Sequence, residues 1–473
     1  MMEKLKECVS FGEKLGADFV EARFDNLTLR TLERTDDTWK SILVKSRKGF
    51  GITAYVEGVS GFSFSASDDK DAIMTATEKA FKMAKTSAAV AMLKLPFEKG
   101  DAIRSKSTET PSVKMHPDEY DIAHKTDLVN RCVETAQEHG ESVRNIRGLY
   151  GELYGKKMLY NSDHSEIDWD FLTTELRVTV TSKTDSGAMV YGTERYGGTV
   201  GLEAYAGDVP EGFGKEAAVR AKEQLTAKAC PAGKFSTLIE ESLVGVLAHE
   251  SFGHLSEADF VVTGSSPLSG KIGERIGSEH ATIHDNGVPD LTKYGGLWMP
   301  YDDQGIAGSD TVILNKGILK HYLHNRGTAQ KLGQKPSGNA RAVQFIYPPI
   351  CRMTNTYFAP GEISNEEEAL EELGTGVYAI QTTGGQVQGD GSFLFKAIRG
   401  YWVENGEIQH PLREVALSGN ILELLNNVYG ATDRLVIKSG YFGGCGKGGQ
   451  FPLPTGLGGP KLLVKDVTFG GKA

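Results

Sequence analysis

The first part of the chain alternates apolar and polar positions in patterns that predict two paired strands and then a helix. Residues 45–65 interleave aromatic and β-branched residues with glycine and polar residues, which is typical of a hairpin. Glu57-Gly58 lies between the two runs and predicts the turn. Residues 68–86 begin with aspartates and end with lysines, the distribution that the helix dipole favours, so we expect a helix there.

A second block repeats this combination. Helical periodicity over 125–138 is followed by strand-like alternation over 152–160 and 171–182, and we expect these strands to extend the first sheet. The polar segment 98–120 contains two prolines and predicts an exposed connection between the blocks.

The main domain boundary is predicted at Cys230-Pro231-Ala232-Gly233, because proline and glycine together disfavour any regular element. This gives an N-terminal αβ domain, 1–230, with sub-blocks at about 1–110 and 118–230, and a C-terminal domain, 231–473. The second domain begins with a helix predicted over 237–253 and is otherwise rich in strands and glycine. The expected fold class is therefore α+β, with the helix inside the strand-rich domain.

Glycine dinucleotides and capping residues refine this expectation. Asn286-Gly287 and Asn405-Gly406 suit tight hairpin turns. Thr237 and Glu240 have capping-box spacing and predict the start of the helix, whose apolar residues recur at helical intervals.

Composition narrows the classes of function. The net charge of −10 over 473 residues offers no basic surface for a nucleic-acid backbone, so no direct nucleic-acid partner is expected. Neither a signal-peptide core nor an apolar stretch of membrane-spanning length is found in the sequence. Five scattered cysteines argue against a disulfide framework and for a reducing compartment. We therefore expect a cytoplasmic protein without a membrane partner.

Candidate chemistry is concentrated in the segment HESFGH, residues 249–254. Two histidines and an adjacent carboxylate are the ligand and base set of hydrolytic zinc sites. His249 and His254 are five residues apart, and on a regular α-helix their rings would point about 140° apart. A π-bulge, or a helix end at Gly253, would bring them to one side, and glycine makes such a distortion cheap. Two unrelated histidines near a helix end are the plainer alternative.

A site with two histidines needs a third protein ligand and one open position for water. Spacing alone does not choose among the candidates, which are Glu257, Asp259, His280, His284, His321, His324 and Cys445. Cys445 is distinguished by the glycines on both sides of it, which allow close approach of the backbone, and by Lys447, which would favour the thiolate.

Other catalytic patterns fail or are weaker. The loop 442–449 lacks the first glycine and the Ser or Thr of a phosphate-binding P-loop, because Tyr441 and Gly448 occupy those positions. No convincing Gly-x-Ser-x-Gly elbow supports a serine nucleophile. The acidic run 366–368 reads as the solvated face of a helix.

Beyond the hexapeptide, longer stretches carry a family resemblance. HESFGHLSEAD, TVILNKGILKHYLHNR, RMTNTYFAPG, TTGGQV and GGCGKGGQ resemble the TldD/PmbA family of metallopeptidases, once called modulators of DNA gyrase, over nearly the whole chain. The resemblance implies one Zn²⁺ per chain held by His249, His254 and Cys445, with Glu250 as general base. HESFGH also fits the HExxGH pattern of a dipeptidyl-peptidase family whose third ligand is a glutamate, but the downstream motifs do not match.

The resemblance also implies substrates and partners. Substrates would be small peptides or unfolded polypeptides. The strand-rich half of the sequence, for its part, favours a substrate bound as an added β-strand. The partner would be a PmbA/TldE-like subunit or a second copy of the chain, and this chain retains every metal residue. Tyr322, His324 and Arg326 are predicted to bind substrate, from their place in a family-like stretch. The rival hypothesis is a non-catalytic or regulatory subunit with a structural metal.

Overall fold

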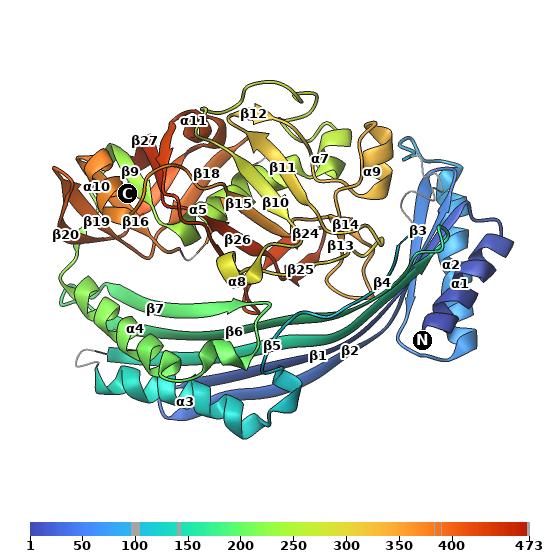
Figure 1. Ribbon diagram of the computed structural model, residues 1–473, viewed down its shortest axis with the longest axis horizontal. Coiled ribbons are helices and arrows are strands. Elements are labelled where there is room, and N and C mark those ends of the chain that lie inside the picture. The colour runs from blue at the N-terminus through green and yellow to red at the C-terminus, as the bar shows by residue number, and fades with distance from the viewer. Residues whose placement is uncertain (96–104, 140–142, 383, 389, 471–473) are drawn as a thin grey trace.

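The protein has an α+β architecture in which a strand-rich body lies on the concave face of one large curved sheet (Figure 1). The structure is a computed structural model and describes residues 1–95, 105–139, 143–382, 384–388 and 390–470. The predicted fold class is confirmed, including the short helix inside the strand-rich half.

The curved sheet has the strand order β3-β2-β1-β5-β6-β4, with β7 also paired to β6. All its pairings are antiparallel except that of β4 with β6. Its strands are β1 (Phe19–Thr35), β2 (Thr38–Val56), β3 (Val59–Ser65), β4 (Lys106–Glu109), β5 (Val143–Asn161), β6 (Glu166–Lys183) and β7 (Met189–Gly198). The predicted turn at Glu57-Gly58 is confirmed, with φ of 50° and 74°. The two predicted αβ blocks thus share one sheet.

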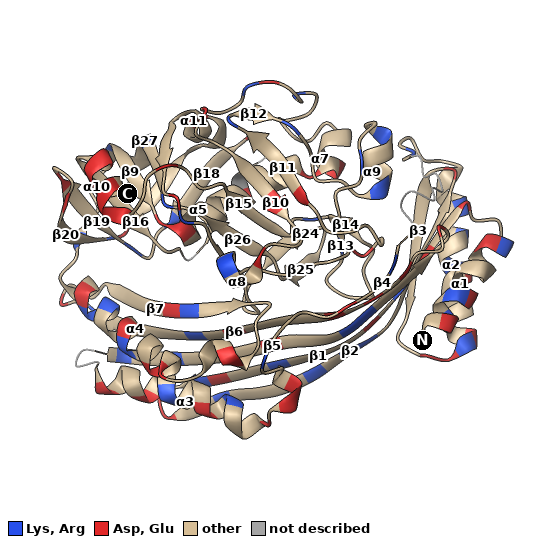
Figure 2. Ribbon diagram, in the orientation of Figure 1, with Lys and Arg blue, Asp and Glu red and all other residues tan. Residues whose placement is uncertain are grey.

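Four helices cover the convex face of this sheet (Figure 1). They are α1 (Met2–Lys14), α2 (Lys70–Ala88), α3 (Ile122–Glu138) and α4 (Val209–Leu225). The short 3₁₀ turn η2 (Pro117–Glu119) precedes α3, and η3 (Leu202–Tyr205) precedes α4. Asp69 begins α2 by accepting the backbone N–H groups of Asp71 and Ala72. Acidic and basic residues are interspersed along these helices rather than separated by sign (Figure 2). The convex face is therefore closed by amphipathic helices and leaves the concave face for the second half.

The second half contains two main sheets. The larger has the order β17-β18-β21-β27-β9-β16-β19-β20-β8, with β22 beside β27, and the smaller has the order β12-β11-β10-β15-β26-β23. The larger contains β8 (Lys228–Ala229), β9 (Gly233–Ile239), β16 (Gly376–Ile380), β17 (Gly385–Val387), β18 (Ser392–Lys396), β19 (Arg399–Glu404), β20 (Glu407–Arg413), β21 (Ala416–Asn420), β22 (Val428–Ala431) and β27 (Leu462–Phe469). The smaller contains β10 (Ile283–Asn286), β11 (Asp310–Asn315), β12 (Ile318–Leu319), β15 (Asn355–Phe358), β23 (Val436–Lys438) and β26 (Gly456–Gly459).

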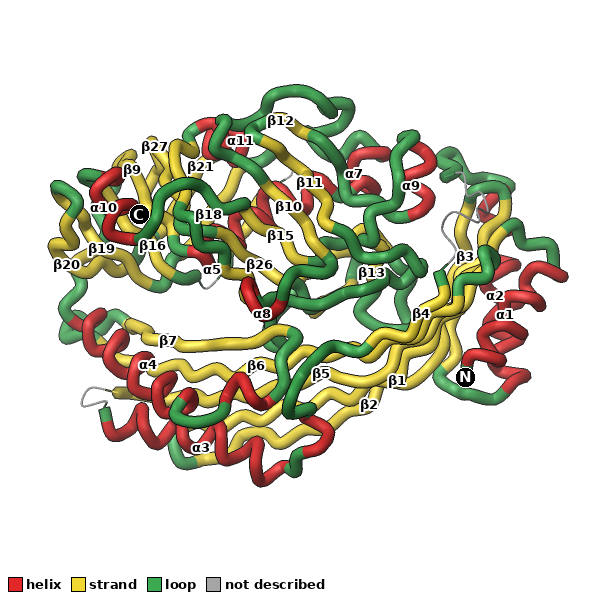
Figure 3. Tube along the Cα trace, in the orientation of Figure 1, coloured by secondary structure: helices red, strands yellow, loops and turns green. Residues whose placement is uncertain are grey.

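Short elements complete this half, and Figure 3 shows how much of it consists of loops compared with the curved sheet. Two hairpins are formed by β13 (Ala340–Arg341) with β14 (Ile350–Cys351) and by β24 (Cys445–Lys447) with β25 (Gln450–Leu453). The remaining helices are α5 (Glu241–Leu247), α6 (His254–Ser256), α7 (Ala258–Val262), α8 (Leu291–Tyr294), α9 (Arg326–Lys331), α10 (Glu366–Leu373) and α11 (Ile421–Asn426). Within the described ranges no helix is long and apolar enough to span a bilayer.

The helix predicted over 237–253 begins later than expected. Residues 233–239 form the central strand β9, paired with both β16 and β27, and Glu240 is the helix N-cap. The predicted capping box at Thr237 is therefore wrong, because two neighbouring strands bury this segment and override its local capping signal. Glu240 instead accepts hydrogen bonds from the backbone N–H and hydroxyl of Ser242.

One of the two predicted tight turns is also wrong. Asn405-Gly406 does join β19 to β20, with φ of 53° and 79°. Asn286-Gly287 ends β10, but the chain then takes a long excursion before β11 returns at Asp310. A dinucleotide predicts a turn only where both flanking segments are strands that pair with each other.

Candidate metal centre

The segment that carries the two motif histidines lies between the two sheets of the second half. α5 packs against β26, and close approach is possible because Gly245 has no side chain to meet the backbone of Gly458. The chain then continues as a π-helix, η4 (Ala248–Gly253), which contacts β15, β26 and β17. The buried helix therefore fixes the position from which the motif begins.

The π-helix solves the five-residue spacing problem. The backbone N–H of His254 donates to the carbonyl of His249, so residues five apart lie one turn apart. The two imidazole centroids are 5.1 Å apart. The predicted π-distortion is confirmed.

The reason given for Gly253 needs correction. Its φ of −57° is ordinary helical backbone that any residue adopts, so conformational freedom does not require glycine here. A Cβ at this position would instead clash with the sulfur of Met353. Glycine is required because the π-helix packs tightly against the neighbouring chain.

Cys445 meets the two histidines from a distant hairpin. Ligand atoms of His249, His254 and Cys445 all lie within 4.8 Å of one another, and the Cys445 sulfur is 3.4 Å from Nε2 of His254. A tetrahedral zinc ion with usual bond lengths separates sulfur and nitrogen ligands by about 3.6 Å. Among the described residues, no further His, Cys, Asp or Glu joins this cluster. Three donors would leave the fourth position open, as in catalytic sites.

The chemistry of the three donors suits a zinc ion. Nδ1 of His249 is buried and has no hydrogen-bond partner within the described chain. Nδ1 of His254 lies 2.8 Å from a carboxylate oxygen of Glu257, which leaves its Nε2 directed at the cluster. Burial alone raises the pKa of Cys445, but the two histidines outweigh it and lower the pKa to about 4. The thiolate that metal ligation requires is thus the favoured form.

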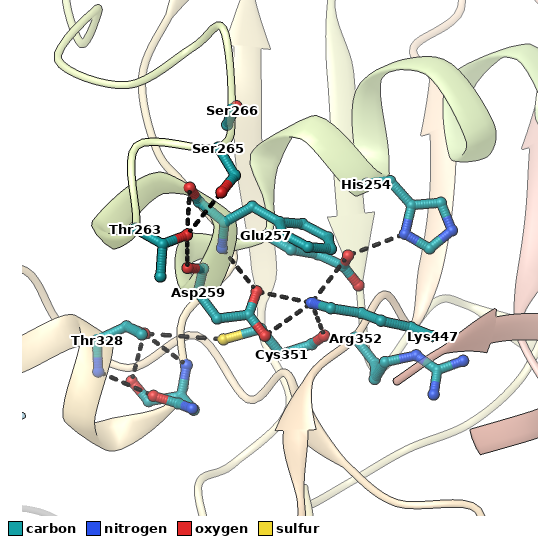
Figure 4. Close-up of polar contacts among 12 residues, drawn as sticks. His254, Glu257, Asp259, Thr263, Ser265, Ser266, Thr328, Cys351, Arg352 and Lys447 are labelled. Atoms are coloured by element: carbon teal, nitrogen blue, oxygen red, sulfur yellow. Dashed lines mark hydrogen bonds and ion pairs between the residues drawn. The ribbon is translucent and has the colours of Figure 1, made fainter. Parts of the chain in front are cut away.

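Behind His254 lies a buried charge network, shown in Figure 4. Glu257 is fully buried, and its oxygen that contacts His254 is 3.1 Å from Nζ of Lys447. The same ammonium group donates to both oxygens of Asp259, at 2.6 and 2.7 Å, and to the carbonyl of Cys351, at 2.9 Å. Burial raises the pKa of Glu257, but His254 and Lys447 outweigh it and lower the pKa. Glu257 is therefore a charged residue that orients a candidate ligand.

The role predicted for Lys447 is therefore different in the structure. The sequence predicts that its charge favours the Cys445 thiolate, but in the structure the histidines provide that effect and Lys447 pairs with Glu257 and Asp259. Lys447 follows Cys445 by two residues on β24, so the hairpin brings both a candidate ligand and the cation behind another ligand.

The loop before Cys445 rests on the curved sheet. The hydroxyls of Tyr441 and Thr31 are 2.8 Å apart, and the Tyr441 ring packs where a Cβ on Gly151 would be. The backbone N–H of Phe442 donates to Glu175 at 2.8 Å. On the other side, the buried Arg352 donates to the carbonyl of Cys445 at 2.7 Å. The first half of the chain thus supports the loop that carries the third candidate ligand.

Glu250 opens onto a small cavity between the two halves. Its side chain is 35% exposed, and its carboxylate is 4.0 Å from Nε2 of His254. The cavity has a volume of about 80 Å³. Its lining residues are Arg195, His249, Glu250, Lys438, Ser439, Gly440, Phe442, Gly444, Thr455 and Leu457. A carboxylate, an imidazole and two cations therefore face one space.

Tyr322, His324 and Arg326, predicted to bind substrate, do not line this cavity. The hydroxyl of Tyr322 donates to the carbonyl of Leu268, and His324 contacts Thr328 and Gln334. Arg326 pairs with Asp163. All three are buried, so this geometry gives their predicted role no support. Sequence reasoning missed Arg195 and Lys438, because no motif marks them.

Other candidates for the third ligand also lie elsewhere. His284 stacks on Tyr357 and contacts Asp310, while Asp259 pairs with Lys447. His280, His321 and His324 are not part of the cluster. The acidic run 366–368 begins α10, whose apolar residues are buried, as predicted.

Comparison with known proteins identifies the class of protein to which the chain belongs. The model of the PmbA/TldA metallopeptidase C-terminal domain matches residues 232–471, and that of the central domain matches residues 116–225. A metalloprotease of Methanocaldococcus jannaschii is 34% identical over 97% of both chains. A zinc metalloprotease TldD homolog of Saccharolobus solfataricus is 36% identical over 52% of this chain and 54% of its own.

Solved structures show the same fold. A crystal structure of a candidate modulator of a DNA gyrase from Thermotoga maritima superposes with a TM-score of 0.77 at 23% identity, covering 99% of both chains. The crystal structure of TldE from Thermococcus kodakarensis also superposes with a TM-score of 0.77, at 17% identity, and the match covers 99% of this chain and all of TldE.

The fold, the site and these relatives define a metalloprotease, which is a hydrolase. The chain belongs to the TldD/PmbA family of metallopeptidases.

Proposed function

We propose that the chain is a zinc peptidase that hydrolyses small or unfolded peptides, with one Zn²⁺ held by His249, His254 and Cys445. The observation that carries the proposal is the cluster of three donors beside the partly exposed carboxylate of Glu250 at a cavity. The printed name of the Saccharolobus relative supports zinc as the metal. The mixed histidine and thiolate donors are also a set that zinc accepts.

In the mechanism we propose, Glu250 is the general base. When bound, zinc supplies Lewis-acid chemistry by acidifying a water molecule and polarising the peptide carbonyl. Glu250 faces the cavity, where it takes the proton of the attacking water and then gives it to the leaving amine. Glu257 holds the ring of His254 in place through Nδ1 during this cycle.

An extended peptide has an available strand edge beside the motif. β17 is the terminal strand of the larger sheet, and it contacts η4. A peptide added to that edge would bind through its backbone, which gives affinity without a strict side-chain requirement. We therefore expect the site to accept peptides of many different sequences.

Replacing the base tests the mechanism. Glu250→Gln should lower kcat on an unfolded peptide by at least a hundredfold while about one zinc per chain remains bound. Glu372→Gln, an exposed substitution on α10, is the matched control and should retain activity. Undiminished hydrolysis by Glu250→Gln would refute the role of the base. A metal held by four protein ligands in a chain without activity would favour the regulatory-subunit alternative.

Assembly and domain division belong to the same proposal. The likeness of this chain to TldE supports its pairing with a PmbA/TldE-like subunit or with a second copy of the chain. Mass measurement of the purified chain with and without such a subunit distinguishes the two. A boundary between 230 and 231 is supported by the family models, which end at 225 and begin at 232.

A further inference from the structure

A second cavity lies where one end of the curved sheet meets the larger sheet of the second half. It has a volume of about 360 Å³, which is within the range of small-molecule sites. The first half lines it with the start of β7 and with Gln224, in the last turn of α4. The second half lines it with residues at the ends of β18 and β20, and α4 contacts β20 (Figure 1). Ligand sites are frequent at such junctions between packed units.

This cavity is separate from the one that contains Glu250. Among the described residues, none lines both cavities. Both adjoin β7, but Tyr191 lines this cavity and Arg195 lines the other, and four residues of strand span about 13 Å. A ligand bound here would therefore leave the candidate metal centre free.

Apolar side chains from both halves form much of the lining, and they are Val190, Tyr191, Ala397, Ile398 and Val415. Val190 and Val415 are buried, whereas Tyr191 is exposed at the surface. Such a lining favours the hydrocarbon part of a ligand, because burying that part removes apolar surface from water.

Two buried donor atoms belong to lining residues and have no hydrogen-bond partner within the described chain. They are Nε2 of Gln224 and Nε of Arg413. Gln224 is 1% exposed, and Arg413 uses a different nitrogen to donate to the carbonyl of Ala227. Most buried donors in native proteins are satisfied, so these two indicate an acceptor that comes from outside the chain.

The charged residues of the lining favour an anion. Lys396 and Arg413 are cations, and Glu414 is the one carboxylate in the described lining, so one positive charge is left over. A carboxylate is the matching acceptor, because hydrogen bonds from neutral and cationic donors to an ionised group are the stronger kind.

We propose that this cavity binds a small carboxylate with an unbranched apolar chain, such as octanoate. The carboxylate accepts hydrogen bonds from Gln224 and Arg413, and the chain packs against Val190 and Val415. Because such a ligand contacts both halves of the chain, it stabilises their docked arrangement. The binding is non-covalent and does not depend on the proposed peptidase function.

The test titrates octanoate into the full chain by isothermal calorimetry, with 1-octanol and octylammonium as matched ligands. We expect octanoate to bind about 10- to 100-fold more tightly than octanol, as hydrogen bonds to a charged group provide. Octylammonium should bind more weakly still, because the lining is cationic. Gln224→Leu should lower octanoate affinity by about 10- to 100-fold and change octanol affinity much less.

The ligand-free Gln224→Leu protein should melt at or above the temperature of wild type, because the variant removes a buried donor without a partner. Loss of folding would then not account for the loss of affinity. Lys396→Met should lower octanoate affinity and its dependence on salt. Lys335→Met removes an exposed lysine outside the cavity and should leave both unchanged.

Three results would overturn the inference: no saturable binding of octanoate, equal affinity for octanoate and octanol, or octanoate affinity that survives Gln224→Leu. None of these measurements requires hydrolysis. Their failure is therefore distinguishable from failure of the proposed peptidase.

Discussion

Replacing Lys447 with methionine should weaken metal binding without touching a candidate ligand. Methionine retains most of the apolar stem but removes the donors that contact Glu257 at 3.1 Å and Asp259 at 2.6 and 2.7 Å. Glu257 is fully buried, so its charge would be opposed only by His254. The position of the Glu257 carboxylate, and with it the orientation of the His254 ring, would then become less well defined.

The expected magnitude follows from the type of contact. Loss of a residue that supports a metal ligand costs about 10- to 100-fold in metal affinity, or about 1.4 to 2.8 kcal/mol. Unfolding free energy should also fall by about 3 kcal/mol, the lower end for a broken buried ion pair. The lower end applies because the Asp259 side chain is 30% exposed and can be hydrated.

The assay is competition for zinc against a chromophoric chelator, with urea unfolding of the same preparations. Lys461→Met is the matched control, because Lys461 bridges Glu241 and Glu366 but contacts no candidate ligand. It should lose stability without losing zinc affinity. Asp259→Asn should also retain zinc affinity, since it leaves the pair between Lys447 and Glu257 in place. Zinc affinity within twofold of wild type in Lys447→Met would refute the reasoning.

Two further predictions concern stability. Gly253→Ala should lower the unfolding free energy by about 1–3 kcal/mol, because the added methyl group meets the Met353 sulfur. Urea midpoints measure this loss, which should be smaller when Gly253→Ala is made in a Met353→Ala background. Burial raises the pKa of Glu21 to about 7, so its stabilising contribution is complete below about pH 4 and is lost as the pH rises through 7. The urea midpoint of wild type, measured relative to that of Glu21→Gln at the same pH, should therefore be lower at pH 8 than at pH 5. A difference between the two proteins that is the same at both pH values would contradict this.

Local signals in the sequence predicted the fold where they agreed with tertiary contacts. The turn at Glu57-Gly58 and the helix predicted over 68–86 needed only their own neighbours. The π-helix could be anticipated because five-residue spacing and a shared metal are incompatible on a regular helix. Thr237 was misread because two partner strands, distant in sequence, bury its segment.

The rest of the site depends on contacts that spacing does not encode. Cys445 is 191 residues from His254, so spacing left it one of several candidates; its flanking glycines distinguished it, and the family resemblance made it the predicted ligand. Lys447 was expected near the thiolate, but the hairpin directs its side chain to Glu257. Arg195 lies in an ordinary strand pattern, and only the packing of the second half on that strand places it at the cavity. Tyr322 and His324 satisfy their polar groups within the protein instead.

The support of the Cys445 loop by Tyr441, Thr31 and Glu175 has a consequence for biogenesis. During synthesis the motif histidines are made long before the cysteine, and the loop that carries the cysteine contacts side chains of the curved sheet. A growing chain therefore holds only two of the three candidate metal donors. We expect the peptidase to be switched on only by completion of its own folding, which would keep unfinished copies from degrading one another in trans.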